Sequence, residues 1–178
     1  LVETMKYVYA DRTYHLGDED FYPVPKQKLT SKEYAKTIFN KLTPYAKASE
    51  EITTQIPTET IESTETTHYS VYDSYGNAVS TTTTINSAFG SGVVVEGAGF
   101  LLNNEMDDFS AKPGVPNMYG LIGGEANKIE PHKRMLSSML PTIVIKDGKN
   151  FFVAGSFRGS RKITTTLQVI MNVIDHRL

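Results

Sequence analysis

The sequence predicts an α+β fold, in which helices come before and after a region of β-hairpins. Three observations lead to this fold class: residues 1–48 are mostly helical in pattern, residues 66–154 are rich in strand-forming residues, and Ile163 to His176 has helical periodicity. Consecutive strands joined as hairpins favour layered α+β packing over alternating βαβ units.

The first 48 residues predict two helical stretches separated by a loop. Leu1 to Ala10 has a helical pattern with no Ser, Asp or Pro ahead of it as an N-cap. The loop is indicated by residues that interrupt helices, namely Asp18, Asp20, Pro23 and Pro25. The run Thr30-Ser-Lys-Glu33 then has the form of a capping box, in which the Glu33 carboxylate reaches back to the cap amide. It predicts a helix through about Leu42.

Residues 48–65 have the composition of a linker. Ser, Thr, Glu and Pro dominate, and no apolar periodicity is present. Such a segment buries too little apolar surface to offset the entropy of ordering it, so we expect it to be exposed and mobile. A chain is most easily cut in a segment of this kind.

Two hairpins are predicted after the linker. Tyr69 to Asp73 and Ala78 to Ile85 are β-branched and aromatic, and the turn residues Tyr75-Gly-Asn77 separate them. Thr142 to Lys146 and Asn150 to Ala154 form a similar pair around Asp147-Gly148, a strong hairpin signal.

The region between the hairpins predicts shorter strands and a long loop. Val93 to Val95 and Phe100 to Leu102 are expected to be strands, split by two glycines. Pro113 to Gly124 is rich in Pro and Gly and predicts a loop of the kind often used as a lid. Because the chain begins without methionine and ends inside a helical pattern, we expect it to be a fragment of a longer polypeptide.

Composition removes several classes of function. A formal charge of −2 gives no electrostatic reason to expect nucleic acid or an anionic membrane as partner. The chain has no cysteine for a disulfide, a thiolate metal site or a thiol nucleophile, and its four histidines lack metal-ligand spacing. No phosphate- or dinucleotide-binding motif is present, so we expect neither metal nor cofactor. No apolar run approaches the roughly 18 residues of a membrane span.

Thr66 is the strongest candidate for chemistry. It directly follows the linker and begins the strand region. If the bond before it were cut, the new α-amine, with a pKa near 8, would act as a base beside the threonine hydroxyl. The β-methyl group restricts χ1 and would hold that hydroxyl in place. On composition alone, the alternative that Thr66 simply starts a strand is favoured.

Several blocks of sequence resemble the bacterial γ-glutamyltranspeptidases, which are N-terminal-nucleophile hydrolases. In the small subunit of that family the matching blocks are Thr66-Thr-His-Tyr-Ser-Val, Gly76-Asn-Ala-Val, Thr84-Ile-Asn86, Leu101-Leu-Asn-Asn-Glu-Met-Asp-Asp-Phe-Ser110, Lys112-Pro-Gly-Val-Pro-Asn, Lys133-Arg134, Leu136-Ser-Ser138 and Pro141-Thr142. Tyr9-Ala-Asp-Arg12 and Gly17-Asp18 resemble the end of the large subunit. The resemblance runs along essentially the whole chain in one order, and the Leu101–Ser110 block is highly specific.

The resemblance implies a four-layer αββα sandwich, incomplete in this chain, and a precursor that cleaves itself. The scissile bond would join Glu65 to Thr66. Residues 1–65 would then end the large subunit, and residues 66–178 would form most of the catalytic small subunit. The partners it implies are glutathione and other γ-glutamyl compounds, amino acid or peptide acceptors, and the remaining large-subunit and C-terminal segments. It also implies a periplasmic or secreted protein.

The resemblance also assigns the site residues. Thr84 would hydrogen-bond the nucleophile, or else be one of four threonines in a strand. Acceptors for the substrate ammonium would be Asn86, Glu105 and Asp108, and donors to its carboxylate Ser137 and Ser138. Taken alone, these acids would be a solvated turn and these serines a helix cap or loop. Tyr119 would close a lid over Asn86, or else be an exposed loop aromatic.

One loop departs from the family pattern. Where the family has Gly-Ser-Pro-Gly-Gly-Ser-Arg, this chain has Gly155-Ser-Phe-Arg-Gly-Ser-Arg161, so Arg158 replaces a glycine that donates to the oxyanion, and Gly159 remains. Met135 and Leu140 are smaller departures beside the serine pair. The arginine that grips the substrate carboxylate in the family is not in this chain. These departures leave an impaired or decayed copy as an alternative to an active γ-glutamyltransferase. A relative that processes poly-γ-glutamate is a separate alternative.

Overall fold

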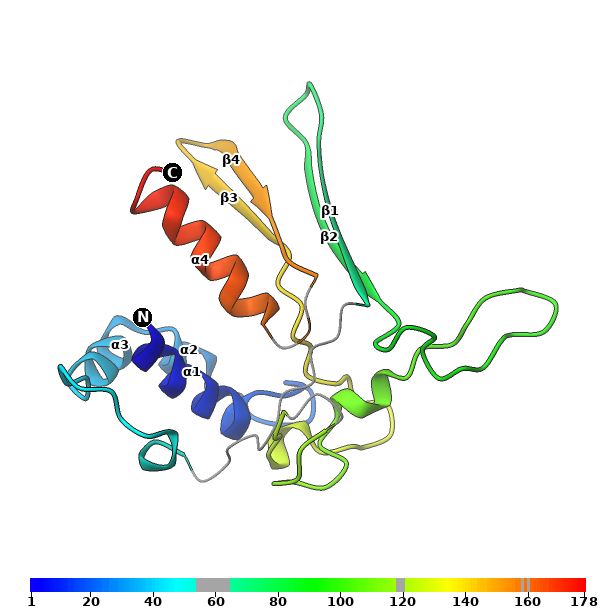
Figure 1. Cartoon of the computed structure of the whole chain (residues 1–178), viewed down its shortest axis with the longest axis horizontal. Helices are drawn as coiled ribbons and strands as arrows, with labels where there is room; N and C mark the ends of the chain where they lie inside the picture. The colour runs from blue at the N-terminus through cyan, green and yellow to red at the C-terminus, as the bar shows by residue number, and fades with distance from the viewer. Residues whose placement is uncertain (54–64, 118–120, 158, 160) are drawn as a thin grey trace. The chain divides into compact units, whose positions relative to one another are not determined.

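The computed structural model describes residues 1–53, 65–117, 121–157, 159 and 161–178 (Figure 1). Helices and antiparallel strands are both present, so the predicted α+β class is confirmed. The chain forms two compact units, which we describe separately. The first unit comprises Leu1–Ile61 and Met106–Leu136, and the second comprises Glu62–Glu105 and Ser137–Leu178.

The first unit is helical. Its helices are α1 (Val2–His15), α2 (Lys26–Leu29) and α3 (Lys32–Phe39), with the 3-10 turns η1 (Ser49–Glu51) and η3 (Glu125–Asn127). Helix α1 contacts both α3 and η3. This confirms the predicted helices broken by a loop, and α1 begins at Val2 with no side-chain cap from Leu1. All the buried hydrophobic side chains of the described residues lie in this unit: Ile38, Phe109, Ile122 and Ala126.

The predicted capping box is wrong in detail. Ser31 is the N-cap of α3, and its Oγ accepts the Tyr34 N–H at 3.0 Å. Thr30 instead closes α2, because its hydroxyl donates to the Lys26 carbonyl oxygen at 2.8 Å. Since the cap moves by one residue, Glu33 is no longer at the third helical position. The helix also ends at Phe39, before the predicted Leu42.

Asp18 and Arg134 join the loop after α1 to a segment far along the chain. The buried Asp18 carboxylate accepts the Arg134 main-chain N–H at 2.8 Å and its Nε–H at 3.0 Å, and it also contacts Nη2. Next to it, Gly17 has no room for a side chain, because a Cβ there would overlap the carbonyl oxygen of Ala126. The loop is therefore fixed at two adjacent positions.

This contact predicts a pH-dependent stability. Hydrogen bonds from Arg134 hold the pKa of Asp18 well below its usual range. When folding lowers the pKa of a carboxyl group, that group stabilises the folded protein at pH values above the pKa of about 3.9 that it has in the unfolded chain. This contribution is lost as the pH falls below that value toward the lower pKa of the folded state. In urea unfolding of the complete gene product, Asp18→Asn should therefore reduce stability at pH 7 and should cost less as the pH approaches 3.

Asp20→Asn is the matched control, because Asp20 contacts the same guanidinium from an exposed position and exposed ion pairs contribute little. An Asp18→Asn penalty that is the same at every pH would contradict this assignment.

The second unit contains two hairpins and a helix. Strands β1 (Thr66–Tyr72) and β2 (Ala78–Thr84) pair antiparallel, as do β3 (Thr142–Lys146) and β4 (Lys149–Ala154), and α4 spans Lys162–Ile174. Both predicted hairpins and the final helix are thus confirmed. Strand β2 contacts β3 and β4, and α4 contacts β4.

Ser80 ties the two hairpins together. Its Oγ donates to the Ala154 carbonyl oxygen at 3.1 Å and accepts the Thr142 N–H at 3.0 Å. The turn of the second hairpin has positive φ at both Asp147 (52°) and Gly148 (74°), as the predicted Asp-Gly turn requires.

The strands predicted at 93–95 and 100–102 are wrong. This segment contains only an isolated antiparallel bridge between Val94 and Leu101. Gly97 and Gly99 both adopt positive φ, which reverses the chain after too few residues for a ladder to extend. Farther along, Glu105–Asp108 forms the 3-10 turn η2.

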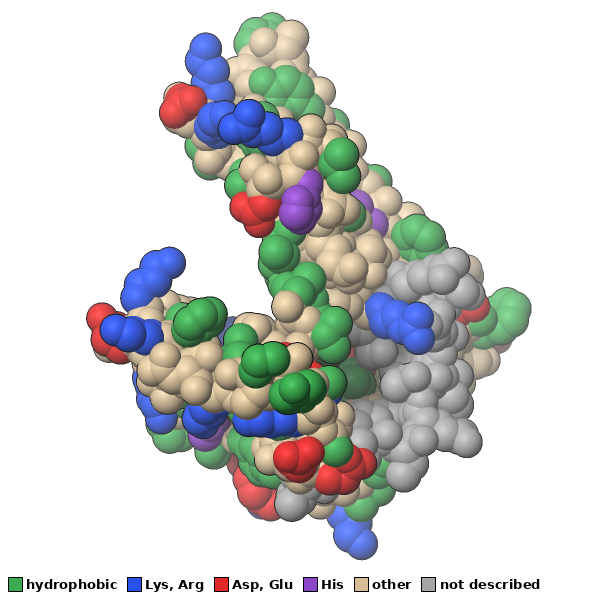
Figure 2. Space-filling model, turned by 60° about the vertical axis from the view of Figure 1, so that its left-hand side comes forward, with side chains coloured by type: hydrophobic (Ala, Val, Ile, Leu, Met, Phe, Trp, Pro, Cys, Tyr) green, Lys and Arg blue, Asp and Glu red, His purple; other side chains and the backbone are tan. Residues whose placement is uncertain are grey.

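Many large apolar side chains are exposed on the described residues. Figure 2 shows apolar side chains on the face that it presents. On the hairpins, the exposed ones include Tyr69, Val71, Tyr72, Val79, Ile143, Ile145 and Phe151. Each described sheet has two strands and therefore two edges.

Among the described helices, none has the length and apolar character needed to cross a bilayer.

Candidate functional site

Thr66 is buried at the first position of β1. Its exposed fraction is 6%, whereas the next residue, Thr67, is exposed. Across the hairpin, Thr66 is the register partner of Thr84, the last residue of β2. Thr66 therefore begins a strand, which is compatible with both interpretations of this residue. Its burial opposite a second threonine is an additional feature that strand propensity does not predict.

A chain of hydrogen bonds leads through Thr84 to the peptide bond before Thr66. The Asn86 main-chain N–H donates to Thr84 Oγ1 at 2.9 Å, and that hydroxyl donates to the Glu65 carbonyl oxygen at 3.4 Å. Each donor in such a chain polarises the next. The hydroxyl of Thr84 is thus directed at the carbonyl that the proposed cleavage would attack.

Asn86 is held in a left-handed backbone conformation, with φ of 76° and an exposed fraction of 7%. Asparagine tolerates this conformation better than most residues. Its Nδ2 donates to the Asn104 carbonyl oxygen at 3.3 Å, and Asn104 Oδ1 accepts the Ser87 N–H at 2.9 Å. The segment after β2 is therefore tied to the residue directly before Glu105.

Glu105 and Asp108 are the first and last residues of η2, and they fall in different units. Burial raises the pKa of Glu105, and the charge of Lys162 opposes that shift. Asp108 lies near a partly buried arginine, Arg12 of α1. Burial lowers the pKa of that guanidinium, while Tyr9 and the Asp108 carboxylate favour its charged form.

Ser137 and Ser138 lie in a segment with no regular secondary structure. The Oγ of Ser137 is exposed and accepts the Met139 N–H at 3.1 Å. This is a local side-chain turn. By secondary structure, both serines are therefore loop residues.

The glycine-containing loop after β4 begins against a histidine. A Cβ at Gly155 would overlap the ring of His68, which lies two residues after Thr66 on β1. The ring nitrogens of His68 contact Thr82 Oγ1 at 2.8 Å and Ser70 Oγ at 3.2 Å. The sequence analysis gave His68 no role, although this residue lies within the family block that begins at Thr66. Gly159 has φ of 24°, while Arg158 and Tyr119 lie outside the described residues.

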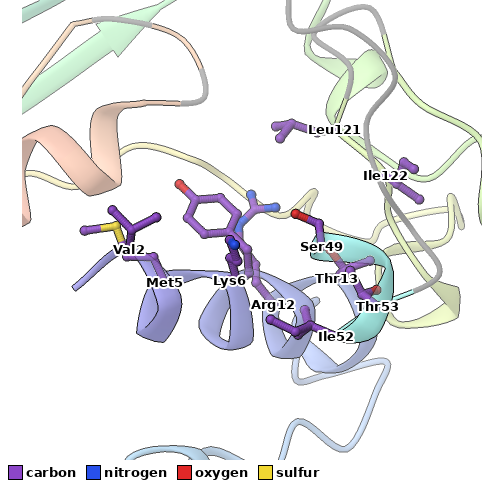
Figure 3. Close-up of a pocket in the computed structure, with 12 residues that line it drawn as sticks. Val2, Met5, Lys6, Arg12, Thr13, Ser49, Ile52, Thr53, Leu121 and Ile122 are labelled. Carbon is purple, nitrogen blue, oxygen red and sulfur yellow. The ribbon is translucent and has the colours of Figure 1, made fainter. Parts of the chain in front are cut away.

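A cavity of about 290 Å³ lies in the first unit (Figure 3). Helix α1 contributes most of its lining, including Val2, Met5 and Arg12, and the loop residues Leu121 and Ile122 lie across from the helix. A second cavity, of about 420 Å³, lies between β1 and β4 in the second unit. Neither is lined by a residue that the sequence analysis assigned to substrate or catalysis.

The structure therefore brings together only part of the predicted site. Glu65, Thr66, Thr84 and Asn86 meet within the second unit. Asp108 belongs to the first unit, where it adjoins Arg12. Within the described residues, no three or more His, Asp or Glu side chains are grouped so that they could hold a metal ion.

Comparison with known proteins identifies the family. The whole chain, residues 1–178, matches the family described as gamma-glutamyltranspeptidase. It is 56% identical over 179 residues to the glutathione hydrolase proenzyme of Escherichia coli strain K12, covering all of this chain and 31% of that protein. It is 52% identical over 182 residues to the glutathione hydrolase proenzyme of Pseudomonas aeruginosa, with the same coverage of each. The chain thus spans about a third of the length of these curated relatives.

A solved structure agrees with the sequence comparisons. The γ-glutamyltranspeptidase T380A mutant of Helicobacter pylori matches with a TM-score of 0.59 and 64% identity, over 63% of this chain and 60% of that one. The matched part of the chain therefore has the N-terminal-nucleophile hydrolase fold that the sequence resemblance implied. The chain belongs to the γ-glutamyltranspeptidase family.

Proposed function

We propose that this chain carries the nucleophile of a γ-glutamyltransferase and glutathione hydrolase that is activated by cutting itself before Thr66. One observation carries the proposal: the Thr84 hydroxyl donates to the Glu65 carbonyl oxygen, directly beside the buried Thr66. A donor at that oxygen stabilises the negative charge that develops when the carbonyl is attacked. The word proenzyme in the names of the E. coli and P. aeruginosa relatives agrees with activation by processing.

Self-cleavage would proceed through an ester. The Thr66 Oγ attacks the Glu65 carbonyl carbon, the Glu65–Thr66 C–N bond breaks, and the nitrogen takes up the proton from the hydroxyl. Water then hydrolyses the ester, which leaves a carboxylate on Glu65 and restores the Thr66 hydroxyl. The products are residues ending at 65 and residues beginning at 66, the proposed subunit boundary.

Turnover would use both groups of the new terminus. The Thr66 α-amine, with an ordinary pKa near 8, accepts the hydroxyl proton as Oγ attacks the γ-carbonyl of the substrate. The departing amine takes up that proton, and a γ-glutamyl ester remains on Thr66. Attack by water gives hydrolysis, and attack by the amine of an amino acid or peptide gives transfer.

The two charges of a γ-glutamyl group require opposite partners. We assign the ammonium to Asn86, Glu105 and Asp108, and the carboxylate to Ser137 and Ser138. Tyr119 is assigned to the lid. The buried Asn86 and the acids at both ends of η2 support the ammonium assignment.

Arg158 and Gly159 are assigned to the oxyanion hole through their main-chain N–H groups. A Cβ where the family has glycine costs about 1–3 kcal/mol if that position needs positive φ. Arg158→Gly should then raise the kcat for γ-glutamyl-p-nitroanilide about tenfold. Phe157→Pro, which would restore the family residue one position earlier without removing a proposed donor, serves as a comparison. An unchanged kcat in Arg158→Gly would mean that the loop tolerates arginine.

Two alternatives remain in the same family: a decayed copy, suggested by Phe157-Arg158, and an enzyme that acts on poly-γ-glutamate. The deciding experiment expresses the complete gene product, separates it on a denaturing gel and determines the amino termini by mass spectrometry. Two polypeptides, one of them beginning at Thr66, together with hydrolysis of glutathione, support the proposal. A single uncut and inactive band would favour the decayed copy, and release of glutamate from poly-γ-glutamate but not from glutathione would favour the other relative.

The resemblance also supports an exported protein, periplasmic or secreted. Glutathione and amino acid or peptide acceptors would be its small partners, and the rest of both subunits its macromolecular ones. Cell fractionation with antibody detection tests the compartment.

A further inference from the structure

We propose that Asn127 is a positioning residue that holds the main chain at Asp108, one of the residues assigned to the substrate ammonium, to the segment that ends at Leu136. This inference rests on the proposed function. The ammonium is assigned to a group of acceptors that includes Asp108, and the carboxylate to the serine pair that begins one residue after Leu136. Asn127 forms side-chain hydrogen bonds to the main chain of both segments, and all of these contacts lie within the first unit.

Both ends of the Asn127 side-chain amide are hydrogen-bonded to the main chain. Its Nδ2 donates to the Asp108 carbonyl oxygen at 2.7 Å, and its Oδ1 accepts the Leu136 N–H at 2.9 Å. A main-chain carbonyl only accepts and a main-chain N–H only donates, so these partners fix the orientation of the amide. Only an uncharged group of this length with one donor end and one acceptor end satisfies both.

Burial makes these bonds hard to replace. Asn127 is 4% exposed, and the residue before it, Ala126, is completely buried. The Asn127 main-chain oxygen also accepts the Ser110 N–H at 2.9 Å, so a third bond ties it to the same segment as Asp108. Water has little access to groups that lose such a partner, and an unsatisfied buried polar group is costly.

The two bridged segments have little regular structure of their own. Asp108 ends a four-residue 3-10 turn, and the described residues from 128 to 141 contain neither helix nor strand. Their conformation must therefore come from side-chain contacts. Asp18 fixes one end of the later segment through Arg134, and Asn127 fixes it again two residues farther on, directly before the serines.

Asn127→Asp is the sharpest test, because it keeps the size and the acceptor for Leu136 but replaces the donor facing Asp108 with a carboxylate oxygen. In the complete gene product we expect two polypeptides as in the parent, because the contacts of Glu65, Thr66 and Thr84 are unchanged. The KM for γ-glutamyl-p-nitroanilide should rise about tenfold, with kcat changing less than about threefold. Asn150→Asp is the control for the same chemical change, because Asn150 Nδ2 also donates to a main-chain oxygen, that of Gly76 at 2.6 Å, but in an exposed hydrogen bond in the second unit.

A substrate without the α-ammonium separates positioning from general damage. Glutaryl-p-nitroanilide has the same acyl chain and carboxylate but lacks that cation. If Asn127 positions Asp108, the preference of the enzyme for the γ-glutamyl over the glutaryl compound should fall in Asn127→Asp by about the same factor as KM rises. An equal loss on both substrates, or a parental KM in the cleaved variant, would overturn the inference.

The outcomes also separate this inference from the proposed function. A parent protein without γ-glutamyl activity refutes the function itself, whereas an active parent with an unaffected Asn127→Asp variant refutes only the role of Asn127. If Asn127→Asp does not accumulate as a cleaved protein, Asn127→Ser is measured in the same way. Serine keeps a donor and an acceptor but is too short to reach both segments, so the same fall in substrate preference is expected.

Discussion

Replacing Thr66 with alanine is expected to leave the complete gene product as one uncut polypeptide with no measurable γ-glutamyl hydrolysis. The substitution removes the oxygen that attacks Glu65, and it therefore also prevents formation of the α-amine that would serve as base. Both functions depend on one side chain, so the loss should exceed the loss from any other single substitution in the site. A denaturing gel and a γ-glutamyl-p-nitroanilide assay measure the two effects.

Thr67→Ala is the matched control, because Thr67 is the adjacent residue of β1 and is exposed. It should be cut and active like the parent. Supplying the chain as two separate polypeptides that end at residue 65 and begin at Thr66 should bypass the cleavage step. Efficient cutting of Thr66→Ala at the same bond would disprove the mechanism.

Thr84→Val is expected to slow self-cleavage by about a hundredfold, because valine keeps the shape of threonine but has no hydroxyl to donate to the Glu65 carbonyl oxygen. Removing one donor to a developing oxyanion costs roughly 2.7–4 kcal/mol. The substitution also removes the Thr84 hydroxyl that accepts the Asn86 N–H. The segment after β2, which contains Asn86, should therefore become more mobile. The rate is measured as appearance of the Thr66 terminus with time.

Thr84→Ser should retain most of the rate, because the hydroxyl remains, although its rotamer is less restricted. Thr83→Val tests the neighbouring exposed position of β2, where loss of the hydroxyl should have no effect. Equal cleavage rates for Thr84→Val and Thr83→Val would show that the hydrogen bond to Glu65 does not contribute.

The local elements were predictable because each depends on nearby residues. Asp147-Gly148 specifies its turn through positive φ, and the flanking β-branched and aromatic residues specify the two strands. The two errors have different causes. At Thr30, the side-chain hydroxyl bonds back to Lys26 and closes the preceding helix, so the next helix is capped one residue later. At Val94, the positive φ of Gly97 and Gly99 reverses the chain, and only an isolated bridge to Leu101 forms.

The site was only partly predictable. Thr66 is marked by the linker before it, and the family blocks mark Asn86 and Asp108. Contacts such as Thr84 to Glu65, His68 to Gly155, or Asn127 to Leu136 depend on tertiary packing, and isolated polar residues give no sign of it. Arg12 and Asp108 are nearly a hundred residues apart in the sequence, and neither one predicts the other.

The first unit is assembled from residues on both sides of the proposed cut. Its buried core combines Ile38 from the earlier piece with Phe109 and Ile122 from the later piece, and the contact between Asp18 and Arg134 crosses the same boundary. Hydrolysis at Glu65 would therefore break the backbone without separating the pieces, because a shared hydrophobic interior and an ion pair still hold them. Cleavage would free the amino terminus of Thr66, and the two fragments would remain associated.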